Sequence, residues 1–185
     1  LQIAGDARFE AMAILSIIIA PDPRLKVKSE PVERVDDGVR KLMDDMLETM
    51  YAAPGIGLSA IQVGIPKRIV VVDVSRADDP RAPLRLVNPE VVWAADEMAT
   101  NEEGCLSLPD HYAELARPGA VTLRYLDEGG AAREIDADGM LAMCVQHEID
   151  HLEGILFVDH LSLVRRNIIL RKLIKARKAK ALKSA

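Results

Sequence analysis

Apolar residues recur at helical spacing in two stretches of the chain. Residues 36–52 place apolar side chains every three or four positions, which predicts an amphipathic helix. Residues 139–153 predict a second helix, with Asp138 as its N-cap and Gly154 as its stop. A last helix is expected to begin near Ser162.

Extended segments are predicted between these helices. Residues 65–74 contain a run of buried β-branched residues, and residues 84–93 have a strand pattern interrupted by Pro89. Residues 121–136 predict a hairpin around the turn sequence DEGG. Most strands precede the last two helices, which favours an α+β fold over a doubly wound parallel sheet. We expect antiparallel sheets around a central metal-binding helix, followed by a C-terminal helix.

The length and composition of the chain fit one domain with a well-filled core. Of its 185 residues, 49 % are hydrophobic but only 3 % are aromatic. We therefore expect no stacking on nucleic-acid bases and no DNA partner. The expected domain spans residues 12–185 and includes a basic C-terminal helix at 162–185. Residues 1–11 precede Met12, a candidate natural start, and are expected to be an N-terminal extension or a cloning remnant.

An apolar run at residues 11–20 raises the question of export or membrane insertion. The segment before it lacks the basic residues of a signal peptide, and Pro21 follows it directly. The run is also too short to span a bilayer. We expect a buried strand or packing arm, in a monomeric cytoplasmic protein without membrane contact.

The segment CVQHEIDHLEG, residues 144–154, carries the strongest chemical signal. His147 and His151 are four residues apart on the expected helix, so both imidazoles lie on one face and can hold one ion. Glu148 lies beside them, where it suits a general base. Burying two histidines and a glutamate among apolar neighbours without a purpose is costly. A metal site is therefore favoured over a solvated helix face.

A catalytic metal site needs a third protein ligand and an open position. Cys144 lies seven residues from His151, about 10 Å along a helix, which is too far for one ion. The remaining candidate is Cys105, in the stretch NEEGCLSLPD. His111 and His160 are rivals, and we expect both at the surface near turns.

The stretch GIGLSAIQVG, residues 55–64, is the third unusual segment. Its two glycines let the backbone approach a ligand, although a turn leading into a strand is the alternative. A phosphate loop is not indicated, because no Lys-Ser/Thr follows. Gln62 is a polar side chain in an apolar run, and its amide is able to donate to an oxyanion.

These three stretches, in this order, resemble the motifs of bacterial-type peptide deformylases. The family carries G-φ-G-φ-A-A-x-Q, E-G-C-φ-S and Q-H-E-φ-D-H, which here read GIGLSAIQ (55–62), EGCLS (103–107) and QHEIDH (146–151). The resemblance extends from about Met12 to the C-terminal helix. It implies a metallohydrolase that removes the N-formyl group from N-formylmethionyl nascent peptides and releases formate.

The resemblance also implies a role for each motif residue. The ligands of Fe²⁺, which Zn²⁺, Ni²⁺ or Co²⁺ can replace, would be Cys105, His147 and His151. Glu148 would take a proton from the attacking water, while the Gln62 side chain and the Leu106 backbone N–H would stabilise the oxyanion. Residues expected at the substrate site are Ile56, Gly57, Glu103, Cys144 and Val145. Glu103 is also expected to pair with Arg117 behind the metal loop.

Two positions depart from the family pattern. Ser59 stands where Ala is usual, and we expect an effect on packing only. Tyr112 stands seven residues after Cys105, where many members have Arg. The resemblance therefore does not define the contacts to the peptide backbone near this residue.

Charge is unevenly distributed along the chain. Nine of the 24 Lys and Arg residues lie after position 164, and none of the 29 Asp and Glu residues does. A basic tail on an acidic protein favours a polyanion, and the resemblance implies a ribosome-docking helix. The alternatives are a solvated helix whose first turns pack on the body, or a membrane surface, which the thinning apolar face after Ile174 disfavours.

Two other functions fit part of the pattern. A metallopeptidase would share the histidine pair and Glu148, but would not need Cys105 or Gln62. A non-catalytic metal module would need a fourth protein ligand, and the sequence offers no well-spaced candidate.

Overall fold

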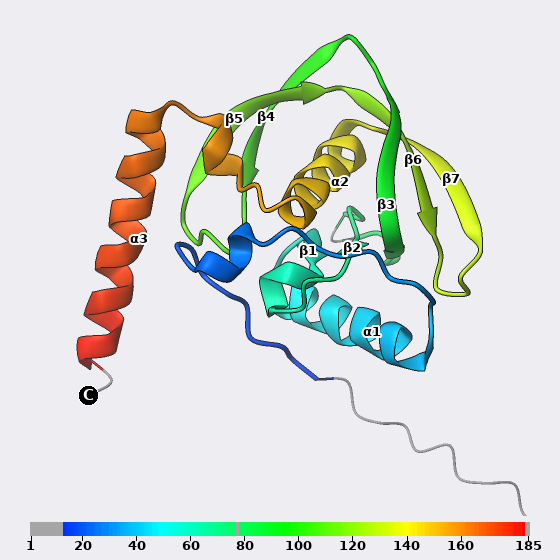
Figure 1. Ribbon diagram of the computed structural model, residues 1–185. Coiled ribbons are helices and arrows are strands. Elements are labelled where there is room, and N and C mark those ends of the chain that lie inside the picture. The colour runs from blue at the N-terminus through cyan, green and yellow to red at the C-terminus, as the bar shows by residue number, and fades with distance from the viewer. Residues whose placement is uncertain (1–12, 77, 184–185) are drawn as a thin grey trace, which may run out of the picture.

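Two antiparallel sheets and three α-helices make up the part of the chain that this computed structural model describes, residues 13–76 and 78–183 (Figure 1). The larger sheet has the order β1-β2-β3-β6-β7, and the smaller pairs β4 with β5. The strands are β1 (Gly57–Ser59), β2 (Ile69–Val72), β3 (Leu84–Ala94), β4 (Met98–Gly104), β5 (Tyr112–Pro118), β6 (Ala120–Leu126) and β7 (Ala132–Asp138). The helices are α1 (Asp37–Ala52), α2 (Gly139–Leu152) and α3 (Leu163–Lys183), with short turns η1 (Pro23–Lys26), η2 (Ala60–Val63) and η3 (Phe157–His160).

Helix α2 lies at the centre of the fold, between the larger sheet and the β4–β5 pair (Figure 1). The four residues of β2 are all buried because alternate side chains face two different hydrophobic clusters. Val70 and Val72 pack in the cluster that includes α2, whereas Ile69 and Val71 pack in the cluster built on α1. A strand covered on both faces has a continuous apolar sequence rather than an alternating one. The predicted α+β fold, with antiparallel sheets around a central helix, is confirmed.

The predicted helices begin and end close to where the sequence pattern places them. The side chain of Asp36 caps α1 by accepting the backbone N–H of Val39 at 2.9 Å. Asp138 occupies the N-cap position of α2, but its side chain makes no capping hydrogen bond. Gly154 follows the end of α2 with a left-handed φ of +74°, and α3 begins at Leu163.

Pro89 bends β3 without ending it. The register against β6 shifts between Val87 and Glu90, and Asn88 adopts a φ of +53°. The Asn88 side chain accepts the N–H of Val32 and donates to its carbonyl, both at 2.8 Å. The expected interruption is therefore a bulge stabilised by a side-chain amide.

The apolar run near the N-terminus forms a packing arm, and no strand is assigned to it in residues 13–20. The Ile18 N–H donates to the Gln62 carbonyl at 2.8 Å, and the Ala20 N–H donates to the Ser107 carbonyl at 2.9 Å. Ile18 and Ala20 are buried. The arm thus joins two of the motif segments through its backbone.

The expectations for residues 1–11 and for Met12 fall outside the described residues. Among the helices that the structure does describe, none combines the length and apolar character needed to cross a bilayer.

Gly154 ends α2 at a point where a side chain does not fit. A Cβ there would lie 2.6 Å from the carbonyl oxygen of Lys26, in addition to the strain of the positive φ. We expect Gly154→Ala to lower the free energy of unfolding by about 2–3 kcal/mol, because a backbone clash adds to a conformational cost of roughly 1 kcal/mol. Thermal and urea denaturation measure this loss.

Gly130→Ala is the matched control for this prediction. Its φ is +79°, but a Cβ would only touch the side chain of Val35 at 3.7 Å. It should therefore show the conformational cost of about 1 kcal/mol alone. Equal losses in the two variants would contradict the role of the Lys26 contact.

Candidate metal centre and active site

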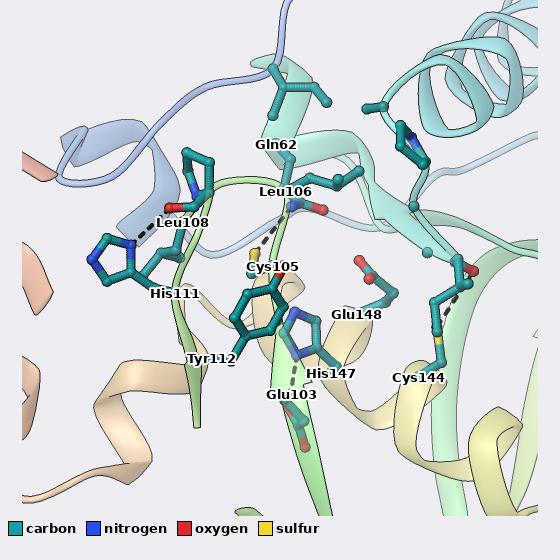
Figure 2. Close-up of a pocket in the computed structure, with 18 of the residues that line it drawn as sticks. Gln62, Glu103, Cys105, Leu106, Leu108, His111, Tyr112, Cys144, His147 and Glu148 are labelled. Carbon is teal, nitrogen blue, oxygen red and sulfur yellow. Dashed lines mark hydrogen bonds and ion pairs between the residues drawn. The ribbon is translucent and has the colours of Figure 1, made fainter. Parts of the chain in front are cut away.

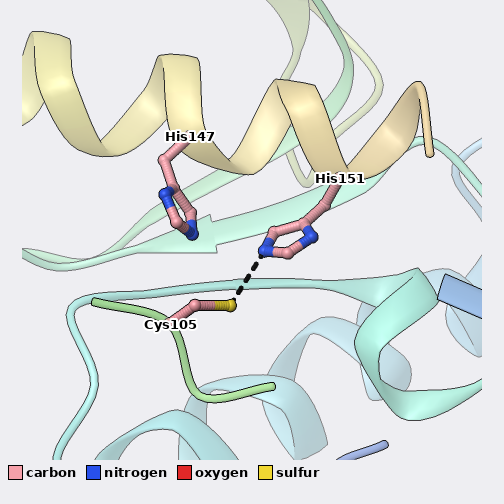
Figure 3. Close-up of side chains that lie close together, drawn as sticks. All are labelled: Cys105, His147 and His151. Atoms are coloured by element: carbon pink, nitrogen blue, oxygen red, sulfur yellow. Dashed lines mark hydrogen bonds between the residues drawn. The ribbon is translucent and has the colours of Figure 1, made fainter. Parts of the chain in front are cut away.

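Cys105, His147 and His151 form a cluster of side chains that could hold one metal ion. Helix α2 presents both imidazoles from successive turns, and the loop after β4 brings Cys105 up to them (Figure 3). The Cys105 Sγ lies 3.2 Å from the His151 Nε2, and the three ligand atoms all lie within 4.8 Å of one another. Ligands held at about 2.0–2.3 Å from one ion in tetrahedral geometry are about 3.5 Å apart, so the cluster has a suitable size.

The donor set fits a divalent transition metal. The Nδ1 of His147 is 2.8 Å from the Glu103 Oε2, which directs the Nε2 of this ring toward the cluster. The Cys105 Sγ accepts N–H groups from Ser107 at 3.4 Å and from Gln62 at 3.5 Å. Among the described residues the cluster has three members, so a bound ion would keep an open position.

A buried ion pair between Arg117 and Glu103 contacts the His147 ring through Glu103. Arg117 donates to both Glu103 oxygens, at 2.5 and 3.0 Å, and to the Asp150 Oδ2 at 2.8 Å. The expected pairing of Glu103 with Arg117 is confirmed. Burial alone would raise the pKa of Glu103, but hydrogen bonds from His147 and Arg117 lower it to about 2. Glu103 therefore remains a carboxylate and fixes the orientation of the His147 ring.

His151 is fully buried, and burial followed by the charge of His147 lowers its pKa well below the usual value. A neutral imidazole is the form that binds a metal ion. The two rings meet edge to face, with centroids 4.9 Å apart. The chemistry of His151 thus agrees with a ligand role.

The carboxylate of Glu148 is buried next to this cluster and is held on both sides. Its Oε2 accepts the Ser59 hydroxyl at 2.6 Å, and its Oε1 fills the space where Gly57 has no side chain, 2.5 Å from the position of a Cβ. Burial raises the pKa of Glu148, although the charge of His147 and the Ser59 hydrogen bond oppose this. The structure therefore adds a hydrogen bond to the packing effect that was expected of Ser59.

Gln62 is buried on η2, and hydrogen bonds to both ends of its amide fix the orientation of the side chain. Its Oε1 accepts the backbone N–H of Ser59 at 2.8 Å, and its Nε2 donates to the Ser107 hydroxyl at 3.1 Å. The same Nε2 faces Cys105, as given above. This orientation puts the amide hydrogens beside the metal cluster.

An open pocket of about 700 Å³ leads to these groups (Figure 2). The predicted site residues that line it are Ile56, Gly57, Gln62, Glu103, Cys105, Leu106, Cys144, His147 and Glu148. Val145 is not among the lining residues and packs instead in the core between α2 and the larger sheet. The Cys144 thiol contacts the Ile56 carbonyl at 3.6 Å, and burial followed by the charge of Glu148 raises its pKa well above the usual value.

Several lining residues were not predicted. Met140 and Met143 line the pocket from α2, and their spacing from His147 on a helix was a signal that could have found them. Ile17 and Ile19 line it from the N-terminal arm, for which the sequence holds no comparable signal.

The two rival histidines do not join the metal cluster. His111 lies at the pocket wall, with its Nδ1 2.7 Å from the Pro109 carbonyl oxygen. His160 is paired with Asp150 at 2.8 Å. Tyr112 is exposed, lines the pocket, and packs its ring over Gly104.

A three-ligand cluster, a buried carboxylate and an open pocket define a mononuclear metallohydrolase site. The family model described as polypeptide deformylase matches residues 14–167 of the chain. The chain belongs to the peptide deformylase family and is a metal-dependent hydrolase.

Relatives and solved structures agree with this assignment. The peptide deformylase of Phenylobacterium zucineum is 56 % identical over 168 residues, which cover 91 % of this chain and 99 % of that protein. The crystal structure of the Ehrlichia chaffeensis peptide deformylase superposes with a TM-score of 0.87 at 42 % identity, over 91 % of this chain and 99 % of that one. A Met-Ala-Ser-bound class I type b peptide deformylase from Acinetobacter baumannii gives a TM-score of 0.76 at 35 % identity, over 82 % and 100 %.

The ion pair behind His147 leads to a prediction about metal retention. Arg117→Ala would leave the buried Glu103 without its main partner, so His147 would lose its fixed orientation. We expect metal affinity to fall by about 10- to 100-fold, as measured by competition with a chromophoric chelator. Arg124→Ala removes an exposed ion pair on the β6–β7 hairpin and should leave retention unchanged. Unchanged retention in Arg117→Ala would count against this support.

Proposed function

We propose that this chain hydrolyses the formyl amide of N-formylmethionyl peptides, using Glu148 as general base beside a metal ion held by Cys105, His147 and His151. The observation that carries the proposal is the convergence of all three family motifs on one pocket. Membership of the peptide deformylase family supports the reaction.

We propose Fe²⁺ as the native ion, with Zn²⁺, Ni²⁺ and Co²⁺ able to substitute. One thiolate and two imidazoles suit all of these ions. Such an ion supplies Lewis acidity, which polarises the formyl carbonyl and makes a water molecule more acidic.

The protein groups then move one proton through the reaction. The Glu148 carboxylate accepts a proton from the attacking water and returns it to the departing amine as the C–N bond breaks, giving formate and a free N-terminus. The raised pKa of Glu148 suits a group that must both take and return a proton. The Gln62 amide and the Leu106 backbone N–H are the proposed donors to the oxyanion.

Substrate binding is proposed along β1. This strand is an edge of the larger sheet, so a peptide can pair with the backbone at Ile56 and Gly57 as an added strand. The methionine side chain would lie against Leu106, Cys144 and the unpredicted Met143. We assign Val145 to the core and Glu103 to the support of His147. The Met-Ala-Ser bound to the Acinetobacter baumannii protein is consistent with such a peptide.

The test uses formyl-Met-Ala-Ser and protein loaded with Fe²⁺ without oxygen. We expect the peptide mass to fall by one carbonyl unit, and Glu148→Ala to lower the rate by roughly a hundredfold or more. Glu102→Ala changes a carboxylate elsewhere on the pocket wall and serves as the control, with turnover close to that of the unchanged chain. A cut backbone with the formyl group retained would indicate a peptidase. An unchanged peptide with metal bound would reject catalysis.

We also propose that the protein acts in the cytoplasm and that the basic end of α3 contacts the ribosome. Ile169, Leu170 and Leu173 pack the helix against the cluster around η3, and α3 stands at one side of the body (Figure 1). Beyond Ile174, the described side chains of Lys175, Arg177 and Lys178 are exposed. A helix anchored by its first half and cationic in its second suits binding to a polyanion.

Neutralising this end of α3 should weaken ribosome binding without affecting catalysis. For Lys175→Gln, Arg177→Gln and Lys178→Gln combined, or for truncation after Ile174, we expect about tenfold weaker binding and a shallower salt dependence in sedimentation assays. Turnover of short peptides should be unchanged. The control neutralises Arg124 and Arg133, which lie on the distant β6–β7 hairpin. Equal binding by the truncated chain would reject the proposal.

A further inference from the structure

Ser59 contacts two of the proposed catalytic side chains at once. Its backbone N–H donates to the Gln62 Oε1 at 2.8 Å, and its hydroxyl lies 2.6 Å from the Glu148 Oε2. The residue is fully buried at the end of β1. One residue therefore joins the segment that carries the amide to the helix that carries the base.

The hydroxyl of Ser59 has two acceptors on the same residue. Besides the Glu148 Oε2, it lies 2.9 Å from the backbone carbonyl oxygen of Glu148. A hydroxyl can donate one proton and accept others. It can donate to the carboxylate, or accept from the carboxylic acid while its own hydrogen turns to the carbonyl. A hydrogen-bond partner is thus present before and after Glu148 takes up a proton.

The other oxygen of the carboxylate is confined by a different contact. A Cβ at Gly57 would lie 2.5 Å from the Glu148 Oε1 and 2.8 Å from the Cys144 Sγ. The carboxylate is therefore limited on one side by the Gly57 backbone and tied on the other by Ser59. Such a group keeps its rotamer through packing and hydrogen bonding together.

We propose that Ser59 is a positioning residue, whose hydroxyl holds the Glu148 carboxylate in the orientation needed for proton transfer. The inference rests on the proposed role of Glu148 as the base. Ser59 touches neither substrate nor metal in this role, and acts only through Glu148. Its backbone N–H would continue to orient Gln62 whatever side chain is present, so substitution isolates the effect of the hydroxyl.

Ser59→Ala is the informative variant, because it removes only the hydroxyl group and leaves a smaller side chain that fits the buried position. We expect kcat for formyl-Met-Ala-Ser to fall by about 10- to 150-fold, the range for losing a hydrogen bond to a charged group. KM, metal content and Tm should stay close to those of the unchanged chain. Ser29→Ala is the matched control, because Ser29 is also buried but its hydroxyl has no hydrogen-bond partner within the described residues. It should leave kcat unchanged.

Rescue by a retained hydroxyl separates positioning from a purely structural role. Ser59→Thr keeps the hydroxyl and should recover most of kcat. If the added methyl group of Thr lowers Tm, Ser59→Cys is tested in its place, because Cys keeps a weak donor without that methyl group. Unchanged kcat in Ser59→Ala would overturn the inference. A loss of kcat that follows a loss of Tm or metal would also overturn it, because Ser59 would then only join β1 to α2.

Glu148→Ala, measured alongside, separates the proposed role of Glu148 from that of Ser59. Retained turnover in Glu148→Ala would reject the base itself, and with it the role of Ser59. An inactive Glu148→Ala together with an unaffected Ser59→Ala would reject only the positioning role and leave the proposed function standing.

Discussion

The ion pair between Arg117 and Glu103 is the interaction on which the site depends. Both residues point inward from the small β4–β5 sheet, and both are nearly excluded from solvent. Removing one partner of a buried, hydrogen-bonded pair typically costs about 3–5 kcal/mol, because the remaining charge stays buried. The pair therefore locks β4 to β5 and, through Glu103, fixes His147. Cys105 follows β4 directly, so the same sheet also sets the position of its sulfur atom.

The larger sheet serves the site in a different way, by making α2 rigid. One face of the helix packs Ala142, Val145 and Leu152 in the core against the sheet. His147 and Glu148 line the pocket from the same helix, and Glu148, four residues before Leu152, lies next to the packed face. A helix fixed by close-packed apolar contacts holds its remaining side chains within narrow limits. The residues that stabilise α2 and the residues that line the pocket thus lie side by side on one helix.

Elements built on apolar periodicity could be predicted from the sequence, whereas those built on polar residues could not. Helices α1 and α2 and the β6–β7 hairpin lie close to the ranges that the spacing of apolar residues predicts. Strands β4 and β5 were missed because Glu103 and Arg117 occupy inward positions, which removes the hydrophobic alternation. The three residues of the candidate metal cluster were recognisable from residue type and motif spacing. The contact between Ser59 and Glu148 could not be predicted from the sequence, because it joins residues 89 positions apart and depends on how β1 packs against α2.

The arrangement of the arm and the cluster also determines when the site can form during synthesis. The arm bonds to the carbonyls of Gln62 and Ser107, and Cys105 meets an imidazole 46 positions further along the chain. Contacts of such sequence separation form late, because the intervening chain must be present and closed into a loop. None of the earlier segments can complete the cluster before α2 has left the ribosome. A nascent copy therefore remains inactive until most of its domain has been made.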